Sequence, residues 1–592
     1  MTDNPRILLG ATVADDGGVY FRLWSDKANR AAVVLYDDDG WEIWEEPLSV
    51  DPEQPHYFGA YLDRASVGSL YRFKLDGKVV GDPYARCFPF GPRGPARVIA
   101  PLKPRLHPKR AIDLTRGEVI YELHVGTFTA EGTFTGVRER LPHLQDLGVT
   151  VLELLPIAAF PGERGWGYDG VGLFAPFIGY GTSAELSELI DAAHAHGMSV
   201  MLDVVYNHLG PECNVLPSYS DLYFHPERKN PWGCAPAFEG VPFRRLVVDS
   251  ARHWLEEVGF DGLRIDAAHE LEPGGEPHIL LEVARIAAAC SPAAVLVAED
   301  DRNDPEQLAT HGVSAVWSDD FHHSLHVLLT GEKDGYYEGY EGTLAELATI
   351  INRNQLYEGQ IFPPSKRARG KPAAGVDRHR FVYSLQNHDQ VGNRALGERI
   401  SALTDPARLR AATLLLLFLP ATPMLFMGQE WGSRSPFLYF ADHAEPLASE
   451  ITKGRRAEFA HFAAFAKDPD AVPDPQKPET FAKSRLSWEE VQEPEAAALL
   501  AFHRAALKLR RDDPVLKNSN VSAHVRGDVL WVERRSEQGV RVLLLNLENA
   551  VVPLGRLELP RDARVLLSSE EAPQSGADGT LAALSAAIFA FA

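Results

Sequence analysis

The sequence predicts an α/β protein built on a (β/α)8 TIM barrel, with an N-terminal β-sandwich domain before it and a small C-terminal β-domain after it. Three observations predict this arrangement. Apolar and polar residues alternate with period two at the start of the chain, eight short apolar runs alternate with amphipathic segments in its middle, and the alternation returns near its end. The 592 residues leave room for all three parts.

The first part has the pattern of a β-sandwich. Short alternating strands are predicted at residues 18–24, 31–36, 57–61 and 69–75. Strands of this length and spacing, separated by turn residues, are typical of two packed antiparallel sheets. Residues 86–108 are rich in Pro, Gly and Arg and lack periodicity, which indicates a linker. We therefore place the sandwich at 1–95 and the start of the catalytic barrel domain at 96.

The middle part has the pattern of a parallel barrel. Apolar strands are predicted at 119–125, 149–155, 200–205, 262–265, 294–298, 315–317, 381–385 and 424–427. Helical segments separate them, for example around 137–147 and 184–196. Such alternation indicates βα units, and eight strands is the number that closes this barrel. An insertion at about 209–243 interrupts the pattern and should lie over the C-terminal face of the barrel.

The last part predicts a β-domain at 513–592, after a barrel domain that ends at 512. Alternation returns at residues 529–533, 540–546 and 588–592. The longest apolar stretch of the chain, 411–427, precedes this domain and contains two prolines. It is too short and too broken to span a bilayer, so we expect a buried helix leading into a strand.

The composition restricts the partners and the location of the protein. A net charge of −23 and a pI near 5.4 argue against binding to nucleic acid or to an anionic membrane, because both are negatively charged. The four cysteines are widely spaced and contain no CxxC pair, which predicts neither a disulfide framework nor a zinc site. The N-terminus shows no secretory signal. We expect a cytoplasmic monomer that acts on a neutral small substrate.

Three acidic residues follow three of the apolar runs, and they are the first candidates for catalysis. They are Asp266, Glu299 and Asp389. A carboxylate just beyond a buried parallel strand lies where barrel enzymes carry their catalytic groups. Any one of them alone would be better explained as a helix cap or a loop charge. Together, on three strands, they favour an active site.

The segments around these acids resemble a known superfamily. The segments 203–208 (Asp-Val-Val-Tyr-Asn-His), 262–266 (Gly-Leu-Arg-Ile-Asp), 297–299 (Val-Ala-Glu) and 386–389 (Gln-Asn-His-Asp) are similar to the four ordered motifs of the α-amylase superfamily of glycoside hydrolases. The resemblance implies cleavage with retention of anomeric configuration. It implies that Asp266 is the nucleophile, that Glu299 is first the acid and then the base, and that Asp389 holds sugar hydroxyls in the transition state.

Further residues of these motifs would bind or support the sugar being cleaved. Arg264 lies two residues before Asp266 on the same strand face, so its charge can keep Asp266 ionised, and Asp203 would support Arg264. His208 and His388 would bond sugar hydroxyls, with satisfied loop histidines as the alternative.

Two aromatic residues are candidates for contact with sugar rings. Tyr168, in Trp166-Gly-Tyr-Asp169, resembles the residue that stacks beneath the reacting sugar, and a core role is the alternative. For Trp232, in the insertion, packing and contact with further glucose units stay equally open.

Other segments resemble one family within the superfamily. Residues 121–129, 160–170, 317–323, 388–394 and 426–431 are similar to maltooligosyltrehalose trehalohydrolases. This resemblance implies hydrolysis of the α-1,4-glucosidic bond adjacent to the terminal trehalose of maltooligosyltrehalose, which releases trehalose and serves its biosynthesis. The matching segments supply the candidate substrate-binding residues His269, Asp319, Asp320, Phe321, His322, His323, Gln390 and Asn393.

Two positions raise separate expectations. Asp300 follows Glu299 where Ser is usual in the family, so we expect its like charge to raise the pKa of Glu299. Asn207 occupies a position that helps to bind calcium in many amylases. The insertion offers no carboxylate-rich cage, so backbone hydrogen bonding by Asn207 is the simpler account, and we expect catalysis with no metal and no cofactor.

Two alternatives remain at this point. A glycogen branching or debranching enzyme shares the N-terminal sandwich and the barrel. A non-catalytic glucan-binding or scaffold protein could keep the same fold, but it is disfavoured because all three carboxylates are present.

Overall fold

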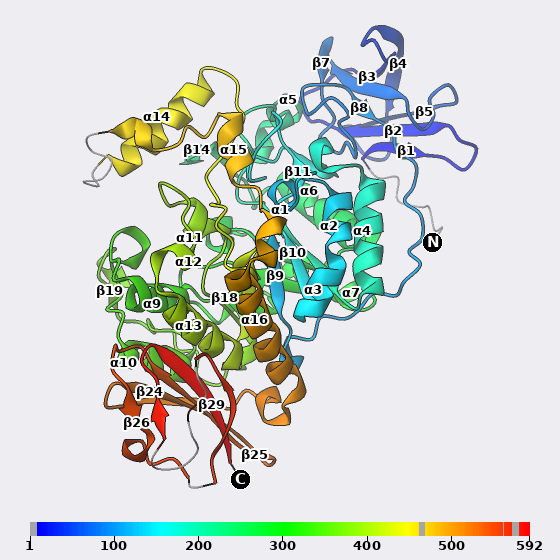
Figure 1. Ribbon diagram of the computed structural model, residues 1–592. Coiled ribbons are helices and arrows are strands. Elements are labelled where there is room, and N and C mark those ends of the chain that lie inside the picture. The colour runs from blue at the N-terminus through cyan, green and yellow to red at the C-terminus, as the bar shows by residue number, and fades with distance from the viewer. Residues whose placement is uncertain (1–8, 461–467, 561, 571–572, 574–578, 592) are drawn as a thin grey trace.

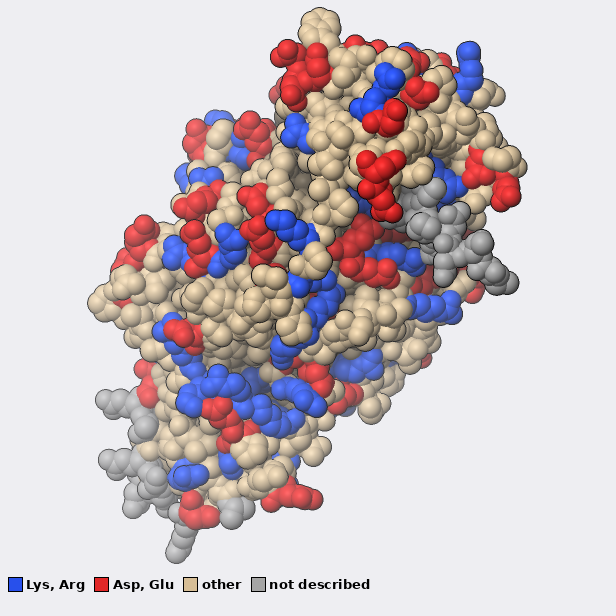
Figure 2. All heavy atoms as spheres, turned by 90° about the vertical axis from the view of Figure 1, so that its right-hand side faces the viewer, with Lys and Arg blue, Asp and Glu red and all other residues tan. Residues whose placement is uncertain are grey.

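The computed structural model describes residues 9–460, 468–560, 562–570, 573 and 579–591. Residues 1–8 of the predicted sandwich and Ala592 of the predicted last strand lie outside them. Figure 1 shows the barrel in the middle, with an N-terminal β-domain at one end and a C-terminal β-domain at the other. In the described part of the chain, no helix is long and apolar enough to cross a membrane. On the face shown in Figure 2, acidic side chains spread over the upper part and Lys and Arg gather across the lower half.

The N-terminal domain is an eight-stranded antiparallel structure with the order β1-β2-β5-β4-β3-β6-β7, and β8 pairs with β6. The long strand β4 pairs with β3 over most of its length and with β5 at its end, so it belongs to both halves of the domain. The predicted strands are β2, β3, β5 and β6, and the sequence missed the other four. The strands are β1 (Gly10–Val13), β2 (Val19–Trp24), β3 (Ala31–Tyr36), β4 (Glu42–Val50), β5 (Tyr57–Leu62), β6 (Leu70–Leu75), β7 (Lys78–Val80) and β8 (Ala96–Arg97).

The predicted barrel is confirmed. Eight parallel strands close in the order β9-β10-β13-β16-β17-β18-β21-β22, and β22 pairs with β9. Every predicted strand lies within two residues of the observed one. The strands are β9 (Ile120–Leu123), β10 (Val151–Leu154), β13 (Ser199–Val204), β16 (Gly262–Ile265), β17 (Val295–Ala298), β18 (Ala315–Trp317), β21 (Phe381–Ser384) and β22 (Thr422–Phe426).

Helices surround the barrel and bury its outer face (Figure 1). The apolar stretch from Ala411 forms the end of one helix and then strand β22, as predicted. The main helices of the barrel domain are α2 (Phe134–Glu139), α3 (Leu141–Leu147), α4 (Ser183–Ala195), α6 (Val241–Arg252), α7 (Ile279–Ala289), α9 (Asp319–Thr330), α10 (Leu344–Arg353), α13 (Pro406–Phe418), α14 (Leu447–Phe459) and α16 (Pro494–Asp512).

The insertion after β13 contains a short helix and a hairpin. They are α5 (Leu216–Tyr219) and the antiparallel pair β14 (Phe224–Asn230) and β15 (Gly233–Pro236). Helix α6 begins at Val241, before the predicted end of the insertion at 243, because Pro242 fits the first turn of a helix. The hairpin turn brings Trp232 onto the ring of His208, with 3.7 Å between ring centroids.

Four ionisable side chains lie within the barrel strands, although such strands are normally apolar throughout. Glu122, Glu153, Asp203 and Arg264 are each no more than 2% exposed. Burial of charge is costly unless the groups are paired or neutral, so each of these side chains needs a partner or a proton.

The C-terminal domain is a five-stranded sheet with the order β23-β24-β25-β29-β27. The sequence predicted β24, β25 and β29 but missed β23 and β27, of which β27 has no fully buried residue. The strands are β23 (Ser522–Arg526), β24 (Val529–Ser536), β25 (Gly539–Asn546), β27 (Arg564–Ser568) and β29 (Ser585–Phe591).

A buried arginine attaches this domain to the barrel. Arg534 on β24 is 0% exposed and donates to the carbonyl of Phe418, at the end of α13, over 2.7 Å. It also donates to the carbonyls of Leu516, Asn518 and Asn520. One guanidinium therefore satisfies backbone groups of two domains at once, and its charge is placed favourably at the C-terminus of a helix.

Replacement of this arginine should destabilise the protein. In Arg534→Met the carbonyls lose their donor in a dry interface, and we expect a loss of about 2–4 kcal/mol of unfolding free energy. Thermal unfolding followed by calorimetry measures it. Arg535→Met on the same strand is the matched control, because that side chain is 64% exposed and pairs only with Glu533 at the surface. Equal melting temperatures for the two variants would contradict the interpretation.

Candidate active site

Arg264 stands at the centre of a cluster of carboxyl groups at the C-terminal ends of the barrel strands. Its Nη1 lies 2.8 and 2.7 Å from the two carboxylate oxygens of Asp203 and 2.9 Å from Asp266 Oδ1. Its Nη2 forms an ion pair of 2.8 Å with Glu299 Oε2. The guanidinium plane also lies over Trp317, 4.3 Å from the ring centroid. One rigid cation thus positions three acids from three neighbouring strands.

The predicted contacts of Arg264 and Asp203 are present, and they explain how the charges are tolerated. Arg264 is fully buried and Asp203 is 2% exposed, whereas the side chains of Asp266 and Glu299 keep 14% and 22% of their surface. Asp203 therefore neutralises the charge of Arg264 inside the barrel, and the two proposed catalytic groups, Asp266 and Glu299, are the ones that reach solvent. Burial raises the pKa of Asp203 to about 6 against the opposing effect of Arg264, which leaves it ionised at neutral pH.

Glu299 has the properties of a general acid. Burial raises its pKa to about 8 in spite of the nearby Arg264, and the charges of Asp266 and Asp389 add to the rise. Its Oε2 accepts a hydrogen bond of 2.8 Å from the backbone N–H of Ala267. A carboxyl with this pKa is protonated at neutral pH, as a residue that must give a proton to a leaving oxygen has to be.

Asp300 does not act as the sequence suggested. Its carboxylate is held by Arg302, whose Nη2 lies 2.6 Å away, and it accepts from Gln307. The charges that act on Glu299 are instead Arg264, Asp266 and Asp389. The expectation that Asp300 raises the pKa of Glu299 is therefore wrong, because Arg302 neutralises the charge locally.

This correction makes a prediction about pH dependence. In the wild type, kcat/KM should fall as pH rises through about 8, where Glu299 loses its proton. In Asp300→Asn this basic limb should stay within about 0.3 pH units of the wild-type position. Initial rates measured across the pH range locate the limb. If the basic limb of kcat/KM moved down by about one pH unit in Asp300→Asn, it would show that Asp300 does raise the pKa of Glu299.

Asn207 and His208 support the nucleophile candidate and the loop around it. The Asn207 Nδ2 group donates to Asp266 Oδ2 over 2.7 Å and to the backbone carbonyl of Asp266 over 2.9 Å. Both of these hydrogen bonds of the Asn207 side chain therefore go to Asp266. His208 is buried, bonds the carbonyl of Tyr168 through Nε2 over 2.8 Å, and has its ring covered by Trp232.

Tyr168 and His388 form the opposite side of the cluster. The Tyr168 hydroxyl donates to Asp203 Oδ2 over 2.6 Å and lies 2.8 Å from His388 Nε2, and the two rings stack with centroids 5.3 Å apart. Both side chains belong to the cluster. His388 in turn contacts Glu122 on β9, a residue that the sequence analysis did not select, since it lies inside a strand.

Asp389 lies on α11 (His388–Gly392) beside a tyrosine that sequence reasoning also missed. Asn393 Nδ2 donates to Asp389 Oδ1 over 2.6 Å and to the hydroxyl of Tyr336 over 2.9 Å. The Tyr336 hydroxyl is 3.5 Å from Asp389 Oδ2, and the side chain is 48% exposed. Tyr336 comes from a segment without a motif, so only the fold could reveal it.

Four of the candidate substrate-binding residues do not face the opening. Asp320 is fully buried and accepts hydrogen bonds from Asn303, Tyr340 and two backbone N–H groups. Phe321 is fully buried and stacks on Tyr383, with centroids 4.3 Å apart. His322 and Gln390 are 3% and 7% exposed. We therefore correct the first three to core residues and assign no ligand contact to Gln390.

The remaining candidates lie around the rim of the cluster. His323 is only 6% exposed, but its ring lies 6.0 Å from that of the exposed Tyr336, and neither ring nitrogen has a protein partner among the described residues. Asp319 is half-buried at the start of α9, and burial raises its pKa to about 6. These two residues are four apart, so they share one face of the helix.

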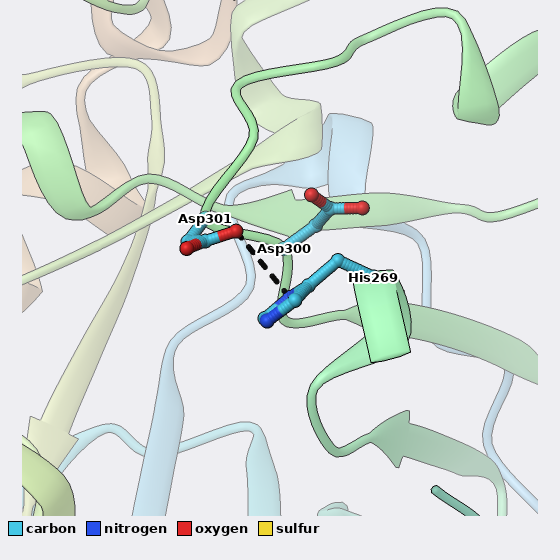
Figure 3. Close-up of side chains that lie close together, drawn as sticks. All are labelled: His269, Asp300 and Asp301. Carbon is cyan, nitrogen blue, oxygen red and sulfur yellow. Dashed lines mark ion pairs between the residues drawn. The ribbon is translucent and has the colours of Figure 1, made fainter. Parts of the chain in front are cut away.

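His269 lies near two aspartates and forms the cluster that comes nearest to a metal site in the described part of the chain. The ligand atoms of His269, Asp300 and Asp301 lie within 4.8 Å of one another. Figure 3 shows Asp301 pointing at His269, with 3.5 Å between Oδ1 and Nδ1, and the carboxylate of Asp300 pointing away. Because Arg302 already binds Asp300, the set offers a cation one free carboxylate, Asp301, and one neutral imidazole, fewer oxygen ligands than hard cations take from proteins.

Two family models match parts of this chain. Residues 8–85 match carbohydrate-binding module 48, the isoamylase N-terminal domain, and residues 105–231 match the alpha amylase catalytic domain. Among solved structures, an alpha amylase candidate from Salmonella typhimurium has a TM-score of 0.89 at 36% identity and covers 98% of this chain and 99% of its own. A pullulanase from GBS in complex with maltotetraose, at 20% identity and a TM-score of 0.76, shares the fold.

Curated relatives are similar over nearly the whole chain. The malto-oligosyltrehalose trehalohydrolase of Deinococcus radiodurans is 41% identical, over 96% of this chain and 94% of its own length. The enzyme of the same name from Saccharolobus solfataricus is 35% identical, over 86% of this chain and 88% of its own. Similarity of this extent, together with the barrel and its acidic cluster, shows that the chain belongs to the malto-oligosyltrehalose trehalohydrolase family.

Proposed function

We propose that this protein hydrolyses the α-1,4-glucosidic bond next to the terminal trehalose of maltooligosyltrehalose and releases trehalose. The observation that carries the proposal is the contact of one guanidinium with both Asp266 and Glu299, the second of which is protonated at neutral pH. An ionised and a protonated carboxyl side by side are what a retaining glycosidase requires. Family membership supports the choice of substrate.

In the first step Asp266 attacks the anomeric carbon and the bond to the trehalose oxygen breaks. Glu299 gives its proton to that oxygen, so trehalose leaves neutral and the glycosyl group is bound to Asp266 as an ester. Arg264 and Asn207 hold Asp266 from two sides and aim one oxygen at the sugar. Asp389, fixed by Asn393, would hold sugar hydroxyls while positive charge develops on the ring.

In the second step water releases the sugar chain from Asp266. Glu299, now ionised, takes a proton from a water molecule, and the hydroxide attacks the anomeric carbon from the side that trehalose left. Two inversions give a product with the α configuration. No metal and no cofactor enters either step.

The pocket for the leaving trehalose should lie on the side of Asp389 and α9. Tyr336, His323 and Asp319 lie around this position, and His269 lies beside Asp301, two residues after Glu299 in the chain. Polar groups suit trehalose, since its outer glucose presents only hydroxyls and no reducing end. We propose Asp319, His323, Tyr336 and His269 as the residues that select the trehalose end.

Loss of one of these polar groups should affect selectivity. In Asp319→Asn we expect kcat/KM for maltotriosyltrehalose to fall about 10-fold relative to that for maltopentaose, because an acceptor for a leaving-group hydroxyl is lost. Parallel initial rates with both substrates measure the ratio. Asp334→Asn, an exposed position in the loop before Tyr336, is the control. An unchanged ratio in Asp319→Asn would remove this residue from the pocket.

We also propose a cytoplasmic monomer without nucleic-acid partners. The four cysteines are all free, which suits a reducing compartment. The net charge of −23 opposes binding to polyanions, and the face in Figure 2 carries both signs of charge with no uniformly basic surface. Light scattering combined with gel filtration would test the monomer.

The experiment for the proposed function compares two substrates with five glucose units. Maltotriosyltrehalose should yield trehalose and maltotriose with a kcat/KM at least about 10-fold above that for maltopentaose. Chromatography of the products identifies them. Transfer of chain segments onto amylose, or cleavage of branched glucan at a higher rate than either substrate, would favour the branching or debranching alternative. The variant Asp266→Asn excludes a contaminating activity.

A further inference from the structure

A chain of hydrogen bonds runs beneath the site from strand β9 to Arg264. Glu122 Oε1 is 2.6 Å from His388 Nδ1, and Glu122 Oε2 accepts from the backbone N–H of His388 over 2.9 Å. His388 Nε2 then meets the Tyr168 hydroxyl, which donates to Asp203. Glu122 is 1% exposed, and both of its carboxylate oxygens contact His388.

The directions of these hydrogen bonds follow from their ends. Asp203 is paired with Arg264 and accepts, so the Tyr168 hydroxyl must donate to it. The Tyr168 oxygen therefore accepts from His388, which requires a proton on Nε2. The Nδ1 atom faces a carboxylate that already accepts from the His388 backbone, and a proton on Nδ1 completes the contact. His388 is thus a donor at both nitrogens, as an imidazolium is.

We propose that Glu122 is a positioning residue for glycosidic bond cleavage, which holds His388 as a doubly protonated donor beneath the sugar and, through it, fixes the ring of Tyr168. The inference rests on the proposed function. Glu122 acts through His388 and does not itself reach the sugar. The isosteric Glu122→Gln keeps the volume and removes the negative charge that makes a proton on both nitrogens stable.

Several titratable groups surround His388, and burial keeps one of them, His124, neutral by lowering its pKa to about 3. They are Glu122 on β9, His124 after β9, Asp203 on β13, Arg264 on β16 and Asp389 next along the chain. Burial lowers the pKa of His388, but Glu122 outweighs it and raises the value to about 9. Without Glu122, Asp389 still raises the pKa of His388, whereas burial and Arg264 lower it, so the pKa should fall and His388 should lose its proton at a lower pH than in the wild type.

The test is the pH dependence of Glu122→Gln relative to the wild type. Near pH 7.5 we expect kcat/KM for maltotriosyltrehalose to be about 10–100-fold lower than in the wild type, and near pH 5 only about 3-fold lower, because acid restores the imidazolium. Glu122→Asp, which keeps the charge on a shorter side chain, should recover part of the loss at neutral pH. A ratio that is constant with pH would show a merely structural role and overturn the proposal.

Two controls make the result specific. Glu153 is the neighbour of Glu122 across the β9–β10 pair, is equally buried, and has no protein hydrogen-bond partner at either oxygen among the described residues. Burial and the charge of Glu122 raise the pKa of Glu153 well above the usual range. Because its carboxyl forms no hydrogen bond to His388, Glu153→Gln should leave the pH profile unchanged. In a His388→Gln background, Glu122→Gln should add less than about 2-fold. If Glu122→Gln lowered the rate in that background as much as in the wild type, it would contradict the relay, by which we mean the chain of hydrogen bonds from Glu122 through His388 and Tyr168 to Asp203.

Failure of this inference is distinguishable from failure of the proposed function. All rates are measured with maltotriosyltrehalose and with α-maltosyl fluoride, which needs no trehalose pocket. A wild type that cleaves only the fluoride would refute the substrate, while the pH-dependent loss in Glu122→Gln would still support the relay. A wild type that releases trehalose, with no pH-dependent loss in the variant on either substrate, would refute the relay alone.

Discussion

Asp266→Asn should reduce kcat for maltotriosyltrehalose by about 10⁴-fold or more, the scale seen when a covalent nucleophile is removed. The replacement keeps the size of the side chain and one acceptor for Arg264, but an amide oxygen cannot form the glycosyl ester. Because Asp266 retains 14% side-chain exposure and Arg264 keeps Asp203 as partner, the fold should survive. Product release followed over hours measures the residual rate, and circular dichroism confirms the fold.

Chemical rescue would make this result specific. In Asp266→Ala, azide can enter the space of the missing carboxylate and attack the anomeric carbon directly. The single inversion should give a β-glycosyl azide from α-maltosyl fluoride. An α-glycosyl azide from this variant would show that another group still acts as the nucleophile, and the role of Asp266 would have to be abandoned.

Glu299→Gln should have the second-largest effect, and the effect should depend on the leaving group. Loss of the acid should lower kcat/KM for maltotriosyltrehalose by about 10³–10⁴-fold, but for α-maltosyl fluoride by only about 10-fold, since fluoride leaves with little help from an acid. The basic limb that the wild type shows near pH 8 should disappear, because the group whose pKa burial raises is gone. Rates with both substrates across the pH range measure both effects.

Chemical rescue by azide also supplies a control for the role of Glu299. In Glu299→Ala, azide should accelerate the second step and give an α-glycosyl azide, the configuration opposite to that from the Asp266 variant. Equal losses on the two substrates in Glu299→Gln would contradict the assignment of the acid, because they would indicate damage to the cluster around Arg264 and no loss of proton transfer.

The barrel could be predicted from the sequence because its strands are nearly continuous apolar runs, and burial on both faces requires such runs. The strands that were missed lack this signal. Strand β4 is exposed along most of its length and carries three glutamates, and β27 has no fully buried residue. Their pairing depends on neighbours distant in sequence, and the alternation within each segment does not reveal it.

The central site was predictable to the extent that its residues lie in motifs at strand ends. The ends of neighbouring strands lie close together, so Arg264 is in direct contact with Asp203, Asp266 and Glu299. The rim was predicted less well, because a matching segment does not say which side of a helix faces the ligand. On α9, Asp319 and His323 are four residues apart and share one face, and His323 lies beside Tyr336, whereas Phe321 packs on Tyr383.

Glu122 and Tyr336 could not be found from the sequence for a different reason. Glu122 stands within a strand and meets His388 across a separation of 266 residues. Tyr336 lies in a short 3-10 helix, Gly335–Tyr337, and reaches Asp389 over 53 residues. Packing of the barrel strands and of the segments that follow them brings such pairs together, so neither residue has a local signal.

The most direct test of the central claim is a proton NMR time course of maltotriosyltrehalose hydrolysis, read before the product anomers equilibrate. The account predicts free trehalose together with maltotriose that is first formed as the α anomer, since Asp266 and Glu299 act by two inversions. Maltotriose that first forms as the β anomer, or cleavage that releases no trehalose, would contradict it.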